Sequence, residues 1–237
     1  MTVTHTHTHP ETVAVLGAGG TMGFPIARNI ARAGIPVRAW HWSRDETEQL
    51  TRDGVRLEDT PADAARGAGI VITILADGEA VAEAMDGPDG ALAVMPGANQ
   101  QNGNRTDEPN GPPHALWVQM GTIGQEATKR CAELANRAGV GFVDAPVLGD
   151  RWPAEQRNLI VLESGPEEAR PRTQPVFDAI ADRTVGPARP AGAASSSSSS
   201  RPAATRTPAP PDASPRAFAK EPARRTTQRS ARLPRPS

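Results

Sequence analysis

The chain has 237 residues, a formal net charge of −1 and one cysteine, Cys131. A single cysteine excludes an internal disulfide, and no apolar run approaches the roughly 20 residues that cross a membrane. We therefore expect a cytoplasmic protein with Cys131 buried in the core. Residues 1–11 lack the basic and apolar segments of a signal peptide, and we expect a disordered leader there. Its alternating histidines could chelate a metal weakly, but a frayed polar leader is favoured and no metal site is predicted.

Charge and composition change near residue 186. From there on the chain holds ten Lys or Arg and two Asp or Glu, a charge of +8, whereas residues 1–185 carry −9. The second part is rich in Pro, Arg, Ala, Ser and Thr, and it cannot bury enough apolar surface to offset chain entropy. We predict a globular domain over residues 12–185 and a disordered basic tail over 186–237.

The strongest local signal lies in residues 13–23, VAVLGAGGTMG. It predicts a buried strand that runs into a glycine-rich turn and opens a helix, an arrangement that binds a dinucleotide pyrophosphate. Gly17 would permit the tight turn, Gly19 the approach of phosphate to the backbone, and Gly23 close packing of the helix on the strand. The third glycine stands one residue beyond the usual GxGxxG spacing, so a plain structural turn is the alternative.

Strand and helix patterns alternate along the rest of the domain. Strands are expected at residues 37–40, 55–57, 69–75, 115–120, 141–144 and 159–162. Helices are expected at 24–34, 47–54, 78–85, 122–139 and 164 to about 181, with a short one that begins at residue 60. Capping sequences begin four of these helices: Ser43–Glu46, Thr60–Asp63, Thr122 with Gln125, and Ser164–Glu167. The repeated units predict an α/β fold with a doubly wound, Rossmann-type and mostly parallel sheet. Residues 97–114, rich in Asn, Gly and Pro, predict an inserted loop.

Four segments together resemble the β-hydroxyacid dehydrogenase family, which includes 3-hydroxyisobutyrate dehydrogenase and relatives of 6-phosphogluconate dehydrogenase. They are VAVLGAGGTMGFPIARNIARAG, ITILADGEAVAEAM, VQMGTIG and FVDAPVLGD. The likeness covers roughly residues 12–185, the family's nucleotide-binding domain. It implies an NAD(P) cofactor and an oxidoreductase that acts on CH–OH groups.

The resemblance assigns the cofactor to two loops and a threonine. The pyrophosphate would be lined by the turn residues Gly17, Gly19, Thr21, Met22 and Gly23. The ribose and nicotinamide side would be covered by Leu75, Ala76 and Asp77, with Thr122 beside them.

The residues after the second expected strand bear on the choice between NAD and NADP. An acid there would bind the ribose 2′-hydroxyl, but the chain has His41-Trp42-Ser43-Arg44. Ser43 and Arg44 suit a 2′-phosphate, so we predict NADP, with NAD as the alternative. In the competing interpretation Ser43 only caps a helix and Arg44 is a solvated charge.

The substrate segments match the family less well. The resemblance places Thr122 and Gly149 against the substrate, a small hydroxy acid. Relatives usually carry Ser-Thr where this chain has Gly121-Thr122, and Ser-Gly-Gly where it has Leu148-Gly149-Asp150. A substrate carboxylate would therefore lose two hydroxyl donors and meet a negative charge.

The family's catalytic lysine and its all-α substrate domain have no counterpart in the pattern. If residues 192–195 are the family's turn, the lysine position falls at Ser198, and the only lysines are Lys129 and Lys220. We therefore expect an NADP-binding domain of a 3-hydroxyisobutyrate dehydrogenase-like oxidoreductase with no catalytic residue of its own and impaired catalysis. An apolar face left without its second domain would favour self-association.

Two other functions are kept as alternatives. A non-catalytic nucleotide-binding remnant of a truncated or frameshifted gene would bind the cofactor without turnover. Nucleic-acid binding through the basic tail is disfavoured, because the tail lacks aromatic groups on which bases could stack.

Overall fold

The computed structural model describes residues 11–95 and 115–186, which all lie in one compact unit spanning residues 1–190. The predicted loop at 97–114 lies outside the described residues, as do most of the predicted leader and tail and the Ser198 position. No helix within the described ranges is long and apolar enough to cross a membrane.

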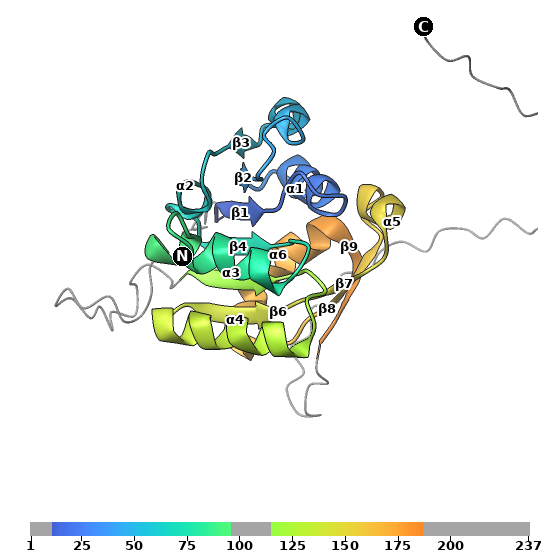
Figure 1. Cartoon of the computed structure of the whole chain (residues 1–237). Coiled ribbons are helices and arrows are strands. Elements are labelled where there is room, and N and C mark those ends of the chain that lie inside the picture. The colour runs from blue at the N-terminus through green and yellow to red at the C-terminus, as the bar shows by residue number, and fades with distance from the viewer. Residues whose placement is uncertain (1–10, 96–114, 187–237) are drawn as a thin grey trace, which may run out of the picture. The chain divides into compact units, whose positions relative to one another are not determined.

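Six parallel strands form the central sheet in the order β3-β2-β1-β4-β5-β6. Figure 1 shows them stacked from β3 at the top of the view to β6 near the bottom. Their bounds are β1 Val13–Leu16, β2 Val37–Trp40, β3 Arg56–Leu57, β4 Ile70–Thr73, β5 Leu116–Gln119 and β6 Gly141–Asp144. This order reverses direction between β1 and β4, as expected of a doubly wound sheet, and confirms the predicted fold class.

Helices cover both faces of this sheet, because successive residues of a strand point to opposite sides. On β1, Val13 and Val15 pack in one core cluster with α1, α5 and α6, while Ala14 and Leu16 pack in another with α2, α3 and α4. The helices are α1 Gly23–Arg32, α2 Pro61–Ala65, α3 Gly78–Asp86, α4 Gln125–Ala138, α5 Arg151–Glu155 and α6 Arg170–Ile180, with shorter 3₁₀ turns η1 Glu48–Asp53, η2 Ala91–Ala93 and η3 Glu167–Ala169.

A second, three-stranded sheet continues beyond β6, and the sequence predicted only one of its strands. It consists of β7 Val147–Leu148, β8 Leu159–Leu162 and β9 Ala181–Val185. β7 runs antiparallel to β8, and β9 runs parallel to it. Backbone N–H groups and carbonyls of Asp144 and Ser164 bond to each other at 2.7 and 2.9 Å, which joins the second sheet to the end of β6.

Three of the four predicted caps are wrong, and each has a local reason. η1 begins after Thr47 without a side-chain cap, and Glu46 instead lies 3.3 Å from His41 Nδ1. α4 begins after Gly124, whose φ of +83° ends the preceding loop, so Thr122 caps nothing. The backbone N–H and carbonyl of Ser164 bond to Asp144 in the bridge between the sheets. The last helix, α6, therefore starts later, at Arg170.

The predicted cap of α2 is confirmed. The Thr60 hydroxyl oxygen accepts the Asp63 backbone N–H at 3.0 Å, and Pro61 occupies the first helical position, where its missing N–H costs nothing.

Candidate functional site

The glycine turn is shaped by the lack of room around it. Gly17 has a φ of +99°, and a Cβ there would overlap the carbonyl oxygen of Ile74. A Cβ on Gly23 would overlap the Gly17 carbonyl, so the first turn of α1 packs directly on the turn backbone. These two glycines therefore meet the predicted requirements for a tight turn and for close helix packing.

Backbone hydrogen bonds tie this turn to the end of β2. The N–H groups of Gly17 and Ala18 donate to the Trp40 carbonyl at 2.9 and 3.1 Å. α1 then starts at Gly23, and the preceding Met22 supplies no side-chain cap. Within the first helical turn, the Phe24 and Ile26 N–H groups donate to the carbonyls of Gly20 and Met22 at 3.0 and 3.2 Å, and Pro25 has no N–H. The Gly23 N–H is the donor of this turn that stays available to an anion, which a helix N-terminus attracts.

A hollow of about 510 Å³ opens at the carboxyl edge of the sheet, in front of this turn. Its lining comes from the loops that follow β1, β2, β4 and β5 and from the segment around β7. Those residues are Gly17, Gly20, Thr21, Met22, Gly23, His41, Trp42, Ile74, Leu75, Ala76, Met120, Gly121, Thr122, Val147 and Gly149. Ligands of open α/β sheets bind at this edge, next to the switch in strand order.

The structure brings eight of the twelve predicted site residues into this lining and leaves Gly19, Ser43, Arg44 and Asp77 outside it. Inside are Gly17, Thr21, Met22, Gly23, Leu75, Ala76, Thr122 and Gly149. Asp77 caps α3 instead, accepting the N–H groups of Glu79 and Ala80 at 3.0 and 2.9 Å. Gly19 faces the His41 ring, and a Cβ there would lie 2.6 Å from Nδ1.

Ser43 and Arg44 lie just outside the hollow, at the tip of β2. The Ser43 N–H donates to His41 Nδ1 at 3.2 Å, and the Arg44 guanidinium is paired with the carboxylate of Asp59. Asp59 follows β3, which pairs with β2. A carboxylate therefore stands at the tip of β2 although residues 41–44 contain none. Both members of this pair are exposed, by 60% and 83% of their side chains, so water weakens their attraction.

A buried polar chain supports the other end of the hollow. The Trp117 indole N–H donates to the Thr73 hydroxyl at 2.8 Å, and Thr73 donates to the Gln119 side-chain oxygen at 2.5 Å. The Gln119 amide then donates to the Gly121 carbonyl at 3.0 Å. All three side chains are buried, so these bonds hold the Gly121–Thr122 turn in one position.

The same turn explains why Gly121 carries no side chain. A Cβ there would lie 3.0 Å from the Leu75 carbonyl oxygen and 3.2 Å from the Gln119 amide nitrogen. A serine at this position would therefore require the loop to move. The Thr122 side chain is exposed, and its hydroxyl has no hydrogen-bond partner among residues 11–95 and 115–186.

The segment after β6 completes the wall. Gly149 has a φ of +131°, and a Cβ there would lie 2.8 Å from a Leu159 methyl group. Asp150 turns its carboxylate to the N-terminus of α5, where it accepts the Trp152 N–H at 3.1 Å. The buried Asn29 amide donates to the Ala154 carbonyl at 2.7 Å and so ties α1 to α5.

Two groups in residues 11–95 and 115–186 have clearly shifted pKa values, and both lie outside this lining. Burial raises the pKa of the Cys131 thiol to about 11, with Arg130 opposing the shift, so the thiol stays protonated and inert at neutral pH. Its burial confirms the prediction of a core cysteine. Burial also raises the pKa of Asp144.

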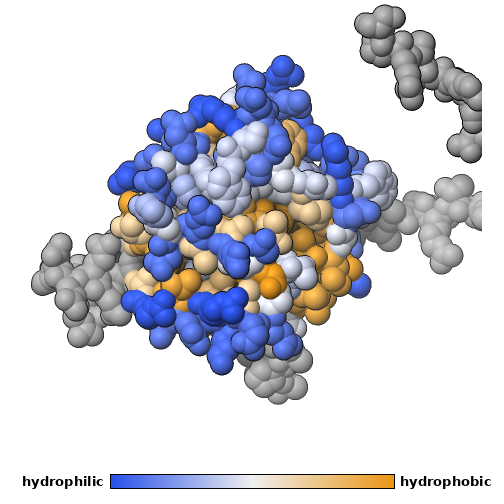
Figure 2. All heavy atoms as spheres, viewed as in Figure 1, coloured by the Kyte–Doolittle hydropathy of each residue, from blue (hydrophilic) through white to orange (hydrophobic). Residues whose placement is uncertain are grey.

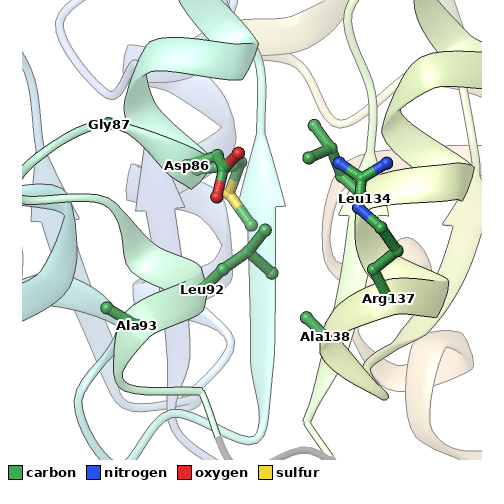
Figure 3. Close-up of a pocket in the computed structure, with 8 residues that line it drawn as sticks. Asp86, Gly87, Leu92, Ala93, Leu134, Arg137 and Ala138 are labelled. Carbon is green, nitrogen blue, oxygen red and sulfur yellow. The ribbon is translucent and has the colours of Figure 1, made fainter.

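A separate hollow of about 350 Å³ lies between α3 and α4 (Figure 3). Met85, Leu92 and Leu134 are among its lining residues, and Asp86 and Arg137 stand on opposite walls. It shares no residue with the glycine turn. Within the described part of the chain, no three His, Cys, Asp or Glu side chains gather as a metal site would require.

Known proteins share this arrangement. Residues 12–187 match the NAD binding domain of 6-phosphogluconate dehydrogenase. The uncharacterized oxidoreductase YfjR of Bacillus subtilis is 33% identical over 171 residues, which are 72% of this chain and 54% of that protein. The 3-hydroxyisobutyrate dehydrogenase of Pseudomonas aeruginosa is 30% identical over 166 residues, 70% of this chain and 50% of that protein.

A solved structure agrees. The 3-hydroxyisobutyrate dehydrogenase of Mycobacterium tuberculosis, determined with L-serine, superposes with a TM-score of 0.64 at 26% identity, covering 75% of this chain and 54% of that one. The chain thus spans about half the length of the relatives it matches. The glycine turn, the strand order and these matches together show that the chain belongs to the family of NAD(P)-binding domains of 6-phosphogluconate dehydrogenase and the β-hydroxyacid dehydrogenases.

Proposed function

We propose that the chain binds NADP in the 510 Å³ hollow and serves as the nucleotide-binding domain of a 3-hydroxyisobutyrate dehydrogenase-like oxidoreductase. The observation that carries the proposal is the turn itself. Gly17 and Gly23 line the hollow without side chains, because a Cβ at either would overlap a backbone carbonyl, and the Gly23 N–H at the uncapped start of α1 stays available. This cradle fits a pyrophosphate.

Each end of the hollow would hold a different part of the cofactor. The turn and the Gly23 N–H would bind the pyrophosphate, and Leu75, Ala76 and Thr122 would face the nicotinamide end. The nicotinamide, when bound, exchanges a hydride with the substrate carbon. The chain's own part is to position that ring and to keep Gly121 and Thr122 fixed through Gln119.

NADP is preferred over NAD because Arg44 and Ser43 stand at the tip of β2, where a 2′-phosphate would lie. Arg44 is the cation of the two and can form a charge-assisted bond to phosphate, and the Ser43 hydroxyl can donate a neutral one. Asp59 is its present partner, so a 2′-phosphate would compete with that carboxylate. Titrations with NADP and NAD, by calorimetry, measure the preference directly.

The substrate class is a small hydroxy acid, by similarity to the Pseudomonas aeruginosa and Mycobacterium tuberculosis enzymes. Thr122 and Gly149 would bound its position. Among the described residues that line the hollow, the only titratable side chain is that of His41, which follows β2 and is separated from the Thr122 end by β1 and β4. No lining group near Thr122 can accept the hydroxyl proton, so we expect weak turnover from this chain.

Gly19→Val tests the proposal. The larger side chain would press on the His41 ring and displace the β2 tip from the turn, and NADPH binding should be lost. Ala93→Val is the control, because it introduces the same side chain at an exposed position that lines the separate hollow and not this one. Equal NADPH affinity in wild type and Gly19→Val would refute the assignment, and robust turnover of hydroxy acids would refute the expected impairment.

Self-association is the second part of the proposal. Leu148 and Val185 are 51% and 47% exposed on the β7–β9 sheet, which Figure 2 shows as an apolar area of the surface. A second copy could cover these side chains. Light scattering should show the double variant Leu148→Ser/Val185→Ser shifted toward monomer relative to wild type.

A further inference from the structure

The hollow between α3 and α4 lies where both helices end. α3 and α4 start just after the loops that line the turn hollow, and they run back along the sheet toward its opposite edge. The last residues of the two helices, together with η2, line a space of about 350 Å³ there. This volume falls in the range of roughly 300–1,000 Å³ found for small-ligand sites. No described residue lines both hollows, so the two are separate.

The lining of this hollow is largely apolar. Met85 is fully buried, and Leu92, Leu134 and Ala138 are partly buried because they pack on the core cluster of this face of the sheet. Their remaining surface is what the hollow exposes. Covering apolar surface in a concave site with the alkyl group of a ligand is favourable, since it removes both surfaces from water. The apolar part of the lining therefore suits an aliphatic group.

Two opposite charges face each other across this apolar surface. Among the described residues that line the hollow, Asp86 and Arg137 are the charged ones, and Figure 3 shows them on opposite walls. Neither forms an ion pair or a side-chain hydrogen bond within residues 11–95 and 115–186. Glu133, one turn before Arg137 on α4, is not paired with it either. The walls thus present one carboxylate and one guanidinium whose bonding capacity is unused within the described part of the chain.

Asp86 also occupies an electrostatically unfavourable place in its helix. It is the last residue of α3, where the helix dipole is negative, and the last turn of that helix contains no basic residue. Arg137 is placed favourably, in the last turn of α4. An ammonium group beside Asp86 would be attracted by both the carboxylate and the helix end. The Asp86 wall therefore suits a cation, and the Arg137 wall suits a carboxylate, which a guanidinium can bind with two parallel bonds.

We propose that this hollow binds a free α-amino acid with an aliphatic side chain, of which leucine is an example. The ammonium group bonds to Asp86, the carboxylate bonds to Arg137, and the alkyl group covers Leu92 and Leu134. An aliphatic amine or a fatty acid would leave one charged wall without a partner, and a polar amino acid would leave the apolar surface in water. The site is independent of the proposed NADP site, because the two hollows share no described residue.

Ligands that each lack one group test the proposal on the unmodified full chain, by NMR chemical-shift titration without cofactor. L-Leucine should bind saturably with a Kd on the order of 1 mM or tighter, and the amide signals of Asp86 and Arg137 should shift. 3-Methylbutylamine lacks the carboxylate, 4-methylpentanoate lacks the amino group and glycine lacks the side chain. Each should bind about tenfold more weakly than L-leucine or worse. Absence of saturable L-leucine binding overturns this inference and leaves the proposed NADP function untouched.

Variants then locate the ligand. Asp86→Asn and Arg137→Gln change exposed side chains, and each should weaken L-leucine binding about tenfold. Asp182→Asn and Arg52→Gln are the matched controls, because both residues are exposed and line neither hollow, and their L-leucine affinity should equal that of wild type. Unchanged affinity in Asp86→Asn and Arg137→Gln overturns the assignment. Dimerisation that Leu134→Ser abolishes would also overturn it, because a second copy would then cover the apolar surface.

Discussion

The two ends of the main hollow are built in opposite ways. At the β5 end, Thr73, Trp117 and Gln119 are buried and bonded in series, and they fix a loop that has no room for a side chain at Gly121. At the β2 end, Arg44, Asp59 and Trp42 are exposed and held by weak or edge-on contacts. Changes at the first end should therefore cost stability, whereas changes at the second should alter affinity and selectivity with little cost to the fold.

Thr73→Val gives the largest expected effect. It leaves the Trp117 N–H and the Gln119 oxygen without their shared partner in a site with no water access. Each unsatisfied buried group costs about 1–3 kcal/mol, so the free energy of unfolding should fall by about 2–4 kcal/mol. Urea denaturation measures it, with Thr51→Val, an exposed hydroxyl bonded to Glu48, as control. A loss of unfolding free energy no greater than that of Thr51→Val would show that the hydrogen bonds of Thr73 do not stabilise the β5 end of the hollow.

Arg44→Ala acts at the opposite end and should leave stability unchanged. We expect NADPH to bind about tenfold more weakly, which corresponds to about 1.4 kcal/mol, while NADH affinity stays the same. Arg52→Ala on η1 removes a nearby arginine that has no ion pair among the described residues and serves as control. Equal weakening of NADPH and NADH would remove the argument for NADP.

Asp59→Asn should produce a smaller effect of the opposite sign. Without the carboxylate, Arg44 is free to meet a 2′-phosphate, and NADP should bind about threefold more tightly. The Asp59 backbone carbonyl still accepts the Trp40 indole N–H, so the β2 tip keeps its shape. Asp53→Asn breaks the ion pair between Asp53 and Arg32, which do not line the hollow, and should leave NADP affinity unchanged. Weaker NADP binding in Asp59→Asn would mean that the acid contacts the cofactor itself.

Asp144→Asn should give the smallest effect, and one that depends on pH. Burial raises the pKa of Asp144 above its ordinary 3.8, so the folded state prefers the protonated carboxyl, and ionisation at neutral pH lowers stability. The variant should therefore melt at a higher temperature than wild type at pH 7. The difference should vanish as the pH falls below 3.8, where the carboxyl is protonated in both states. A gain that persists at low pH would point to packing rather than charge.

Much of the first half of the fold could be predicted because its signals are local. β2 was predicted to the residue, and the Thr60–Pro61 start of α2 needed only neighbouring residues. The second sheet was largely missed because β7 is two residues long and β9 follows α6 without a turn signal. Its pairing is decided by β8 and by the Asp144–Ser164 bridge, which joins residues 20 positions apart.

The sequence alone determined the glycine turn, because the positive φ at Gly17 and the contact of Gly23 with the Gly17 carbonyl both arise within one strand–turn–helix unit. It also determined the alternating fold and the family likeness. Only the tertiary structure decided what surrounds the turn. It placed Asp59 against Arg44 and linked Thr73 to Gln119 beneath Gly121. These contacts join residues from different strands, and only pairing of the strands in the observed order brings such distant positions within bonding distance.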